Sequence, residues 1–389
     1  MRYIQNIKKI FNIVSIRIKL GGIKRHEKAL TIFEGLKLGE KSVTYAEAGV
    51  DIDQLDSSKE RILKMIMSTC DARTEVLRVF GHFAGLIQIG KKIVTLHTDG
   101  VGTKVLVAQM TDKYDTIGID GVAMSVNDTI CVGAEPIALV DTIALEKMDP
   151  NLVEDLIKGI VEGAKQAKTA IVGGETAPYP GVITGIPGKI GFDISVTVLG
   201  FAEKSGLILG DKMQVGDDII GLESSGIHSN GLSFARKVFF NVAKLKIRDE
   251  VEEGFIVGEE LLIPTKIYVN EVMKVIKKTT VHGLVNITGG SFTKLKRIRK
   301  TTNLGFELDN LPDPPPIFKA IQRLGKVKTQ EMYKTFNQGI GFCIICPKEE
   351  SETIIKICKN LGTKAQMIGK ITNKDGTVQI ETEKEIVKF

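Results

Sequence analysis

One short segment combines glycines, a carboxylate and a lysine in an order that suits phosphate chemistry. Residues 99–104 read Asp-Gly-Val-Gly-Thr-Lys and follow Lys92–Thr98, an apolar stretch typical of a β-strand. Glycines let backbone N–H groups approach an anion, and a helix that begins after them favours negative charge. Lys104 could neutralise a phosphate, and Asp99 stands where a carboxylate could hold Mg²⁺. The segment does not match the P-loop pattern G-x-x-x-x-G-K-[ST], and its glycines could also form no more than a tight turn.

A second carboxylate-bearing segment predicts a helix over residues 117–132. Its apolar residues gather on one side, while Asp120 and Asn127 lie almost in line on the opposite side. Asp128 lies about 80° further round. Asn and Asp are poor residues for the middle of a helix. They indicate either a solvated helix face or a metal-phosphate site, because Mg²⁺ prefers one or two carboxylates, waters and phosphate oxygens.

Three further loops place polar residues beside glycine. Glu175 follows the predicted strand Ala170–Val172 in Gly-Gly-Glu-Thr, which would bring a third carboxylate to a strand end. Residues 224–231 (Ser-Ser-Gly-Ile-His-Ser-Asn-Gly) and 288–291 (Thr-Gly-Gly-Ser) stand beside helix starts and are candidate anion cradles. His228 could act as acid, base or hydrogen-bond donor, although a histidine in a turn often has a structural role.

Apolar strand-like runs alternate with amphipathic helical stretches from about Val43 onward, which predicts an α/β protein. Asp149-Pro150 is typical of a helix N-terminus, and further helices are predicted over 229–240 and 264–277. A turn-rich connection at 200–218 indicates a domain boundary. We therefore predict a basic, poorly ordered extension at 1–40, an N-terminal domain at 41–208 and a C-terminal domain at 209–389.

Charge and hydropathy exclude several classes of protein. The 389 residues are 43% hydrophobic and 26% charged, as expected of a globular chain. No apolar run is long enough to cross a bilayer, so we expect no membrane partner. The net charge of +6 is carried by residues 1–40, which hold nine Lys/Arg and three Glu. The body is therefore close to neutral, and we expect no nucleic-acid partner.

The cysteines indicate a reducing compartment. Their number, five, is odd and they are spread along the chain, which favours free thiols in the cytoplasm. Cys343 and Cys346 lie in an apolar run that reads as a buried strand, so packing is the favoured role for both. The histidines show no metal-ligand spacing, and zinc chemistry is not expected.

Together these segments resemble the phosphoribosylformylglycinamidine cyclo-ligase (aminoimidazole ribonucleotide synthetase) family of purine biosynthesis. TDGVGTK and ND belong to a wider ATP-using superfamily, whereas YAEAGVDID, SSGIHSNG and EMYKTFN are specific to the cyclo-ligase. The segments that carry the resemblance are 45–53 (YAEAGVDID), 98–104 (TDGVGTK), 117–136 (IGIDGVAMSVNDTICVGAEP), 172–177 (VGGETA), 224–231 (SSGIHSNG), 264–269 (PTKIYV), 287–290 (ITGG) and 331–337 (EMYKTFN).

The resemblance implies an α/β (α+β) protein with a two-domain aminoimidazole-ribonucleotide-synthetase-like fold. Strands of the N-terminal domain would form a barrel between the subunits of a homodimer, and ATP and substrate would share a long cleft. ATP would phosphorylate the formyl-derived amide oxygen of formylglycinamidine ribonucleotide. The ring nitrogen would then attack that carbon, phosphate would leave, and 5-aminoimidazole ribonucleotide would form.

The resemblance also assigns residues to roles, with ATP and Mg²⁺ as cofactors and a need for K⁺ left open. The catalytic residues would be Asp99, Lys104, Asp128 and His228. The metal ligands would be Asp99, Asp128 and Glu175. ATP and its phosphates would bind Gly100, Gly102, Thr103, Lys104, Asn127 and Lys64. The substrate would bind Ser229, Asn230, Thr288, Gly289 and Asn337.

The chain departs from the family pattern at several positions. Asn286 replaces the family's usual His before Ile-Thr-Gly-Gly, and Ser291 replaces a glycine. Asn keeps a hydrogen bond but cannot titrate. Pro178-Tyr179 stand where Glu-Met is usual, and the family's early ATP lysine falls at Leu63, with Lys64 as the neighbouring substitute.

Three alternatives stay open from the sequence. The chain could be another ATP-dependent enzyme of the superfamily, such as a thiamine-monophosphate kinase or a formylglycinamidine synthetase. It could be a nucleotide-binding homologue without activity, in view of Asn286 and Tyr179. A nucleic-acid-binding module would rest only on the basic extension.

Overall fold

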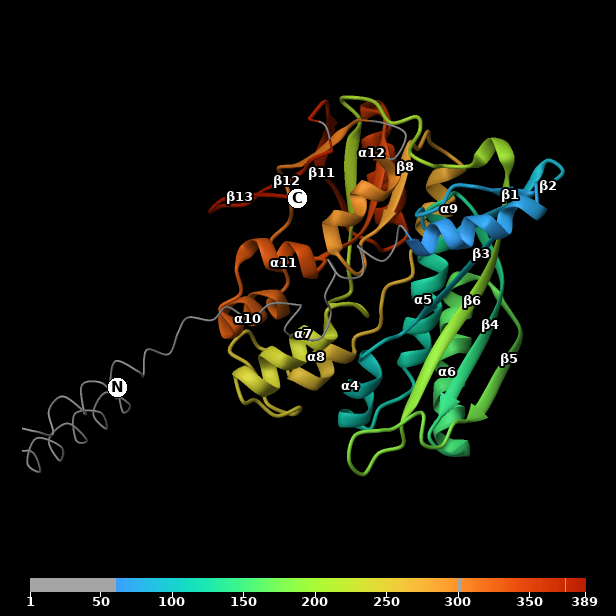
Figure 1. Ribbon diagram of the computed structural model, residues 1–389. Helices are drawn as coiled ribbons and strands as arrows, with labels where there is room; N and C mark the ends of the chain where they lie inside the picture. Colours follow the sequence, from blue (N-terminus) through green and yellow to red (C-terminus); the bar gives the residue numbers. More distant parts are fainter. Residues whose placement is uncertain (1–60, 300–302, 375) are drawn as a thin grey trace, which may run out of the picture. The chain divides into compact units, whose positions relative to one another are not determined.

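The computed structural model describes residues 61–299, 303–374 and 376–389, all of which belong to one compact unit, Val43–Phe389 (Figure 1). The predicted extension at 1–40 and the YAEAGVDID segment at 45–53 lie outside the described residues. Residues 61–68 are helical and carry Lys64, whose side chain is exposed.

Within the described residues, the first sheet contains six strands in the order β1-β2-β3-β6-β4-β5. Only β4 and β5 pair in parallel. The strands are β1 (Val76–Leu77), β2 (Gly85–Ile89), β3 (Lys92–Gly100), β4 (Glu135–Leu145), β5 (Ala170–Pro178) and β6 (Phe192–Glu203).

Helices α4 (Lys104–Thr111), α5 (Ile117–Ile130) and α6 (Pro150–Ala167) belong to this half. The prediction of a strand running into a helix at Lys104 is confirmed, as is the helix from residue 117. The predicted cap of α6 is also confirmed, because Asp149 Oδ1 accepts hydrogen bonds from the amides of Asn151 (3.0 Å) and Leu152 (3.1 Å).

In the part of the chain that the structure describes, the second sheet contains seven strands in the order β13-β12-β9-β11-β7-β10-β8. All neighbours are antiparallel except β9 and β12. The strands are β7 (Asp218–Glu223), β8 (Gly283–Asn286), β9 (Gly305–Leu308), β10 (Ile340–Cys346), β11 (Ala365–Thr372), β12 (Val378–Glu381) and β13 (Ile386–Lys388). Its helices are α7 (Leu232–Arg236), α8 (Val257–Leu262), α9 (Val269–Ile276), α10 (Pro316–Gly325), α11 (Thr329–Thr335) and α12 (Ser351–Asn360).

Two predicted elements in this half differ from the structure. The helix expected from Pro264 begins only at Val269, and the helix expected over 229–240 begins at Leu232 and becomes a π-helix over Lys237–Val242. The delayed start of α9 follows from the amides of residues 265 and 268, which donate to side chains of α5 instead of joining a helix.

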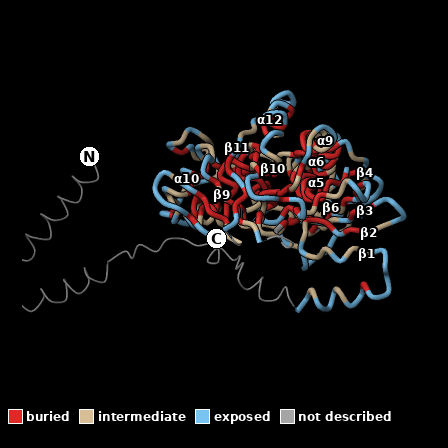
Figure 2. The backbone as a smooth tube through the Cα atoms, turned by 90° about the horizontal axis from the view of Figure 1, so that it is seen from above, coloured by how far each residue is buried: buried red, intermediate tan, exposed pale blue. Residues whose placement is uncertain are grey.

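The buried core includes residues of α5 and α6 in the first half and of the central strands of the second sheet. Strands β1 and β2 lie at an exposed margin (Figure 2). All residues of β10 are buried, and all five cysteines are free and buried, which confirms the packing role predicted for Cys343 and Cys346. Within the described ranges, no helix has the length and apolar character needed to cross a bilayer.

The strand that carries Glu175 is longer than the sequence indicated. We expected it to end at Val172, with Glu175 in the loop beyond, but β5 continues to Pro178. The parallel ladder with β4 holds Glu175 opposite Thr142. This part of the prediction was wrong, because ladder pairing overrides the low strand propensity of Gly-Gly.

The first sheet ends at Glu203 and the second begins at Asp218, on either side of the turn-rich connection predicted at 200–218. The domain boundary at residue 208 stays a prediction.

Candidate active site

Helix α5 carries the predicted polar residues into the interior. The side chains of Asp120 and Asn127 are fully buried, and Asp128 is 6% exposed. The solvated-face interpretation is therefore wrong for this helix. Its polar stripe faces the loops of the second half and not solvent, as the contacts of each residue show.

Asp120 joins α5 to the segment before α9. Its Oδ1 accepts hydrogen bonds from the amide and hydroxyl of Thr265, at 2.8 and 2.6 Å, and from Ser229 Oγ at 3.0 Å. The ammonium of Lys104 lies 2.9 Å from the same oxygen and donates to the carbonyl of Ile263 at 2.6 Å. Burial lowers the pKa of Lys104, against the opposing effect of Asp120. The pair is thus a buried ion pair in which the ammonium makes two hydrogen bonds, while Asp120 Oδ2 has no partner among the described residues.

Asn127 repeats this connection two turns later. Its Nδ2 donates to the carbonyl of Lys266 at 2.8 Å, and its Oδ1 accepts from the amide of Tyr268 at 3.0 Å. The phosphate-binding roles of Lys104 and Asn127 stay predictions. Either role would require these side chains to leave bonds that join the two halves of the chain.

Asp99 and Asp128 come together at the end of β3. Asp99 Oδ1 accepts from the amide of Gly100 at 2.8 Å. Burial raises the pKa of Asp99, the Gly100 amide lowers it, and the nearby Asp128 carboxylate raises it. Asp128 Oδ1 accepts from Asn286 Nδ2 at 2.7 Å, and its Oδ2 lies 3.6 Å from His97 Nε2. Two carboxylates at one strand end match the donor set that Mg²⁺ prefers alongside phosphate oxygens.

Glu175 does not join these two carboxylates within one chain. Asp99 pairs with Val196 of β6, Val196 with Asp141 of β4, and Asp141 with Gly174 of β5. Asp99 and Gly174, the neighbour of Glu175, are therefore three strand spacings apart, roughly 14 Å. Among the described residues, no three His, Cys, Asp or Glu side chains are grouped as a metal site would require. Of the three predicted metal ligands, a single chain brings together Asp99 and Asp128, and their role as ligands stays a prediction.

The candidate substrate loops of the second half meet each other. A side chain added at Gly289 would lie 3.3 Å from Asn230 Nδ2, which places loops 224–231 and 288–291 side by side. Asn230 Oδ1 is buried and has no hydrogen-bond partner in the described part of the chain. Asn337 Nδ2 donates to the carbonyl of Gly226 at 2.9 Å, and its Oδ1 accepts from Ser224 Oγ at 3.0 Å. Asn337 thus shapes the loop, whereas Asn230 retains a free acceptor.

His228 is held in the same loop in a left-handed conformation, with φ of 64°. Its Nε2 accepts from the amide of Ser225 at 3.2 Å, which leaves the proton on Nδ1. Burial, together with the charges of Lys104 and Lys266, lowers the pKa of His228 to about 3. The ring is therefore neutral near pH 7.

Comparison with known proteins decides the family. Residues 81–202 match the N-terminal domain of AIR synthase related proteins, and residues 214–381 match the C-terminal domain. The chain is 48% identical over 336 residues to phosphoribosylformylglycinamidine cyclo-ligase of Methanocaldococcus jannaschii, covering 85% of this chain and 93% of the relative. The corresponding protein of Methanothermobacter thermautotrophicus is 44% identical, covering 87% and 97%. The chain belongs to the phosphoribosylformylglycinamidine cyclo-ligase family. It is an enzyme of the ligase class that acts in purine biosynthesis, as the motifs indicated.

Solved structures share the fold of this cyclo-ligase at low identity. They include "AaThiL complexed with AMPPCP and TMP", with a TM-score of 0.59, 17% identity, and coverage of 84% and 95% of the two chains. A "HypE-HypF complex" has a TM-score of 0.59 at 18% identity, with coverage of 84% and 97%. These values support the predicted two-domain α/β class. The kinase-like alternative is not favoured, because the relatives above 40% identity are named cyclo-ligases.

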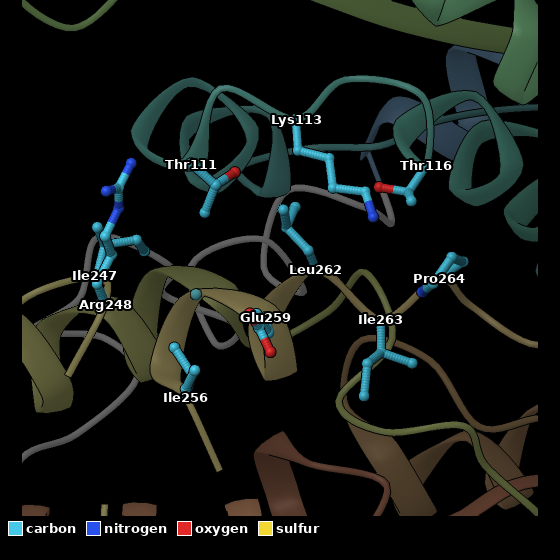
Figure 3. A pocket seen from close by; sticks show the side chains of 11 residues that line it. Thr111, Lys113, Thr116, Ile247, Arg248, Ile256, Glu259, Leu262, Ile263 and Pro264 are labelled. Carbon is cyan, nitrogen blue, oxygen red and sulfur yellow. The ribbon is translucent and has the colours of Figure 1, made fainter. Parts of the chain in front are cut away.

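Thr116, the residue before α5, lines a cavity of about 550 Å³ (Figure 3). Asp128 lies near the other end of this helix. Lys113 and Thr116 line one side, and Ile263 and Pro264 line another. Thr116 and Asp128 are twelve residues apart along the chain, about 18 Å along the helix axis. None of the predicted site residues lines this cavity.

The motifs did not reveal the partners of the site residues. Thr265, His97 and the bond from Asn286 to Asp128 became visible only in the folded chain. Asn286 had one sequence signal, its departure from the family pattern. His97 had none, since an isolated histidine in a strand is ambiguous.

Proposed function

We propose that this cyclo-ligase closes formylglycinamidine ribonucleotide to 5-aminoimidazole ribonucleotide with ATP, and that the nucleotide binds where β3 ends beside α5. The observation that carries this proposal is the pairing of Asp99 and Asp128 at one buried strand end. Structural neighbours support the use of ATP and of a related substrate: one is a complex with AMPPCP, another is a complex with ATP, and a third is "T. maritima PurL complexed with FGAR".

Asp99 and Asp128 fit a site for Mg²⁺, which when bound would neutralise charge on the triphosphate. The backbone of Gly100 and Gly102 would approach the phosphates, and Gly102 has the positive φ of 70° that glycine adopts readily. Phosphoryl transfer depends mostly on positioning and charge neutralisation. The protein's own contribution is therefore to hold two carboxylates and a glycine-rich turn at fixed positions.

The substrate would lie against loops 224–231 and 288–291. Asn230 offers a free acceptor there, and Gly289 lies beside it. Thr288 precedes Gly289, and its own amide and carbonyl are bonded to Asn286 and Ser291. Ring closure gains from holding the ring nitrogen and the activated carbon at near-attack distance. His228 is better suited to shaping the loop than to proton transfer, because its ring is neutral and its Nε2 is occupied by the Ser225 amide.

The same proposal includes a homodimer in the cytoplasm. One face of the first sheet bears exposed apolar side chains, among them Leu96 and Val172, at 51% and 67% exposure. Such a face marks an interaction surface. Free, buried cysteines agree with a reducing compartment.

A direct assay tests the function. Purified protein with formylglycinamidine ribonucleotide, ATP and Mg²⁺ should form equal amounts of ADP, phosphate and 5-aminoimidazole ribonucleotide. Asp99→Asn and Asp128→Asn should each lower kcat/KM by roughly 100-fold or more, because each removes charge from the proposed metal site. Asp155→Asn, an exposed change on α6, is the matched control and should keep full activity. ATP turnover with thiamine monophosphate, and none with formylglycinamidine ribonucleotide, would refute the proposal.

A further inference from the structure

The bond between Asn286 and Asp128 joins the two halves of the chain. Asn286 is the last residue of β8 in the second sheet, and Asp128 lies on α5, which packs on the first sheet. The bond from Nδ2 to Oδ1 is 2.7 Å long, and both side chains are buried. A buried carboxylate that loses such a donor has no ready replacement from water, so the bond fixes how Asp128 is oriented.

Asn286 is also continuous with the candidate substrate loop. The amide of Thr288 donates to the carbonyl of Asn286 at 3.1 Å, and the amide of Ile287 donates to Gly341 of β10 at 2.9 Å. Residues 286–288 are thus tied to the second sheet. Gly289, the next residue, lies beside Asn230. A shift of the loop when substrate binds would therefore reach the Asn286 side chain directly.

The other oxygen of Asp128 faces the first half. His97 Nε2 lies 3.6 Å from Asp128 Oδ2 and has no hydrogen-bond partner in the part of the chain that the structure describes. His97 precedes Asp99 by two residues on β3, on the same face of the sheet. Asp128 is therefore held between a donor from the second sheet and a histidine from the strand that carries Asp99.

We propose that Asn286 is a positioning residue that couples the substrate loop at 288–290 to the nucleotide site at Asp99 and Asp128. This inference rests on the proposed function of those two sites. Because the Asn286 side-chain amide is neutral, it links the substrate loop to the nucleotide site without adding a charge beside the two carboxylates. By thermodynamic linkage, each ligand then raises the affinity for the other by the same factor. The device promotes the binding of both reactants together.

Calorimetric titration tests the coupling without turnover. The probe is a non-hydrolysable ATP analogue with Mg²⁺, added with and without formylglycinamidine ribonucleotide. In the wild type we expect the substrate to tighten analogue binding at least about 5-fold, within the usual range of such coupling. In Asn286→Leu, which keeps the shape but removes the donor, this factor should fall to about 1. Analogue binding alone should weaken about 10-fold, as for a lost hydrogen bond to a charged group.

Two further variants make the result specific. Asn286→His keeps a donor and should retain most of the coupling. Asn270→Leu is the matched control, because it removes an amide that donates to the Gln166 carbonyl at 3.0 Å, at an exposed position on α9. It should leave the coupling unchanged. If Asn286→Leu does not fold, Asn286→Ser, whose hydroxyl is too short to reach Asp128, takes its place with the same expected loss.

The outcomes separate this inference from the function. Full coupling in Asn286→Leu or Asn286→Ser would overturn the inference while leaving the ligase activity intact. The absence of coupling in the wild type would also overturn it. Failure of the wild type to form 5-aminoimidazole ribonucleotide would instead overturn the proposed function.

Discussion

At the scale of single residues, burial decides which groups can carry charge. His228 lies inside the loop 224–231 with its Nε2 bonded to the Ser225 amide, and burial lowers its pKa to about 3. Unfolding exposes the ring, whose ordinary pKa is 6.5. Between these two values the unfolded chain binds a proton that the folded chain does not. The stabilising contribution is therefore complete above pH 6.5 and is lost as the pH falls toward 3.

We predict that the free energy of unfolding of the wild type falls with pH over this window. One such group gives a slope of up to about 1.4 kcal/mol per pH unit. His228→Asn, chosen because Asn tolerates positive φ, should show a smaller slope. Urea unfolding at several pH values between 4.5 and 7.5 measures the difference. Equal slopes in both proteins would contradict a buried neutral His228.

Burial also governs Asp120 and Lys104, which carry opposite charges. The carboxylate of Asp120 and the ammonium of Lys104 are both fully buried, and Ser229 and Thr265 add hydrogen bonds to Asp120. A buried charge is tolerated only with such a set of partners. These residues connect the two halves of the chain, whatever further role Lys104 has toward phosphate.

At the scale of elements, α5 determines where the site forms. It packs so closely on α6 that a side chain on Gly118 would lie 2.2 Å from the amide nitrogen of Ile160. A side chain on Gly159 would lie 2.5 Å from the carbonyl oxygen of Asp115. This contact fixes the height and rotation of α5, and so the positions of Asp120 and Asp128.

We predict that Gly118→Ala lowers the free energy of unfolding by about 3 kcal/mol, because the helices must move apart. Activity should fall with it, since α5 carries Asp128. Gly206→Ala is the matched control, because nothing lies within 4 Å of the added atom and the backbone there is not left-handed. It should stay within about 0.5 kcal/mol of the wild type. Chemical denaturation measures the free energy of unfolding of both variants. An equal loss in Gly118→Ala and Gly206→Ala would refute close packing at Gly118.

At the scale of the whole molecule, the described residues cover one face of the first sheet and leave the other face exposed. Helices α5 and α6 pack on the covered face (Figure 1). On the other, Leu96 of β3 pairs with Leu199 of β6, and Val140 of β4 and Val172 of β5 extend the apolar surface. Exposed apolar side chains that extend over several strands mark an interaction surface, which a second subunit could cover.

We predict that the wild type sediments as a dimer at micromolar concentration and that Leu199→Asp, a charge on a central strand of this face, shifts it to monomer. Met148→Asp is the matched control, since Met148 is also an exposed apolar residue, at 53% against 38% for Leu199, but lies outside the strands. It should remain dimeric. A monomeric wild type in analytical ultracentrifugation would exclude the proposed homodimer.

The sequence by itself determined the local features and the family. Apolar periodicity and capping residues identified β3, α5, the start of α6 and β10, because these signals arise within a few neighbouring residues. The motifs, read in order, indicated the cyclo-ligase family that the comparisons confirm.

The tertiary structure decided what each polar residue contacts. Asn286 reaches Asp128 across 158 positions of sequence, and Thr265 reaches Asp120 across 145. Helical periodicity shows that Asp120 and Asn127 share a face, but it cannot show whether that face meets water or another part of the chain. The length of β5 was likewise set by pairing with β4, which placed Glu175 away from Asp99. Long-range pairing depends on the whole fold, and for that reason only the folded chain revealed it.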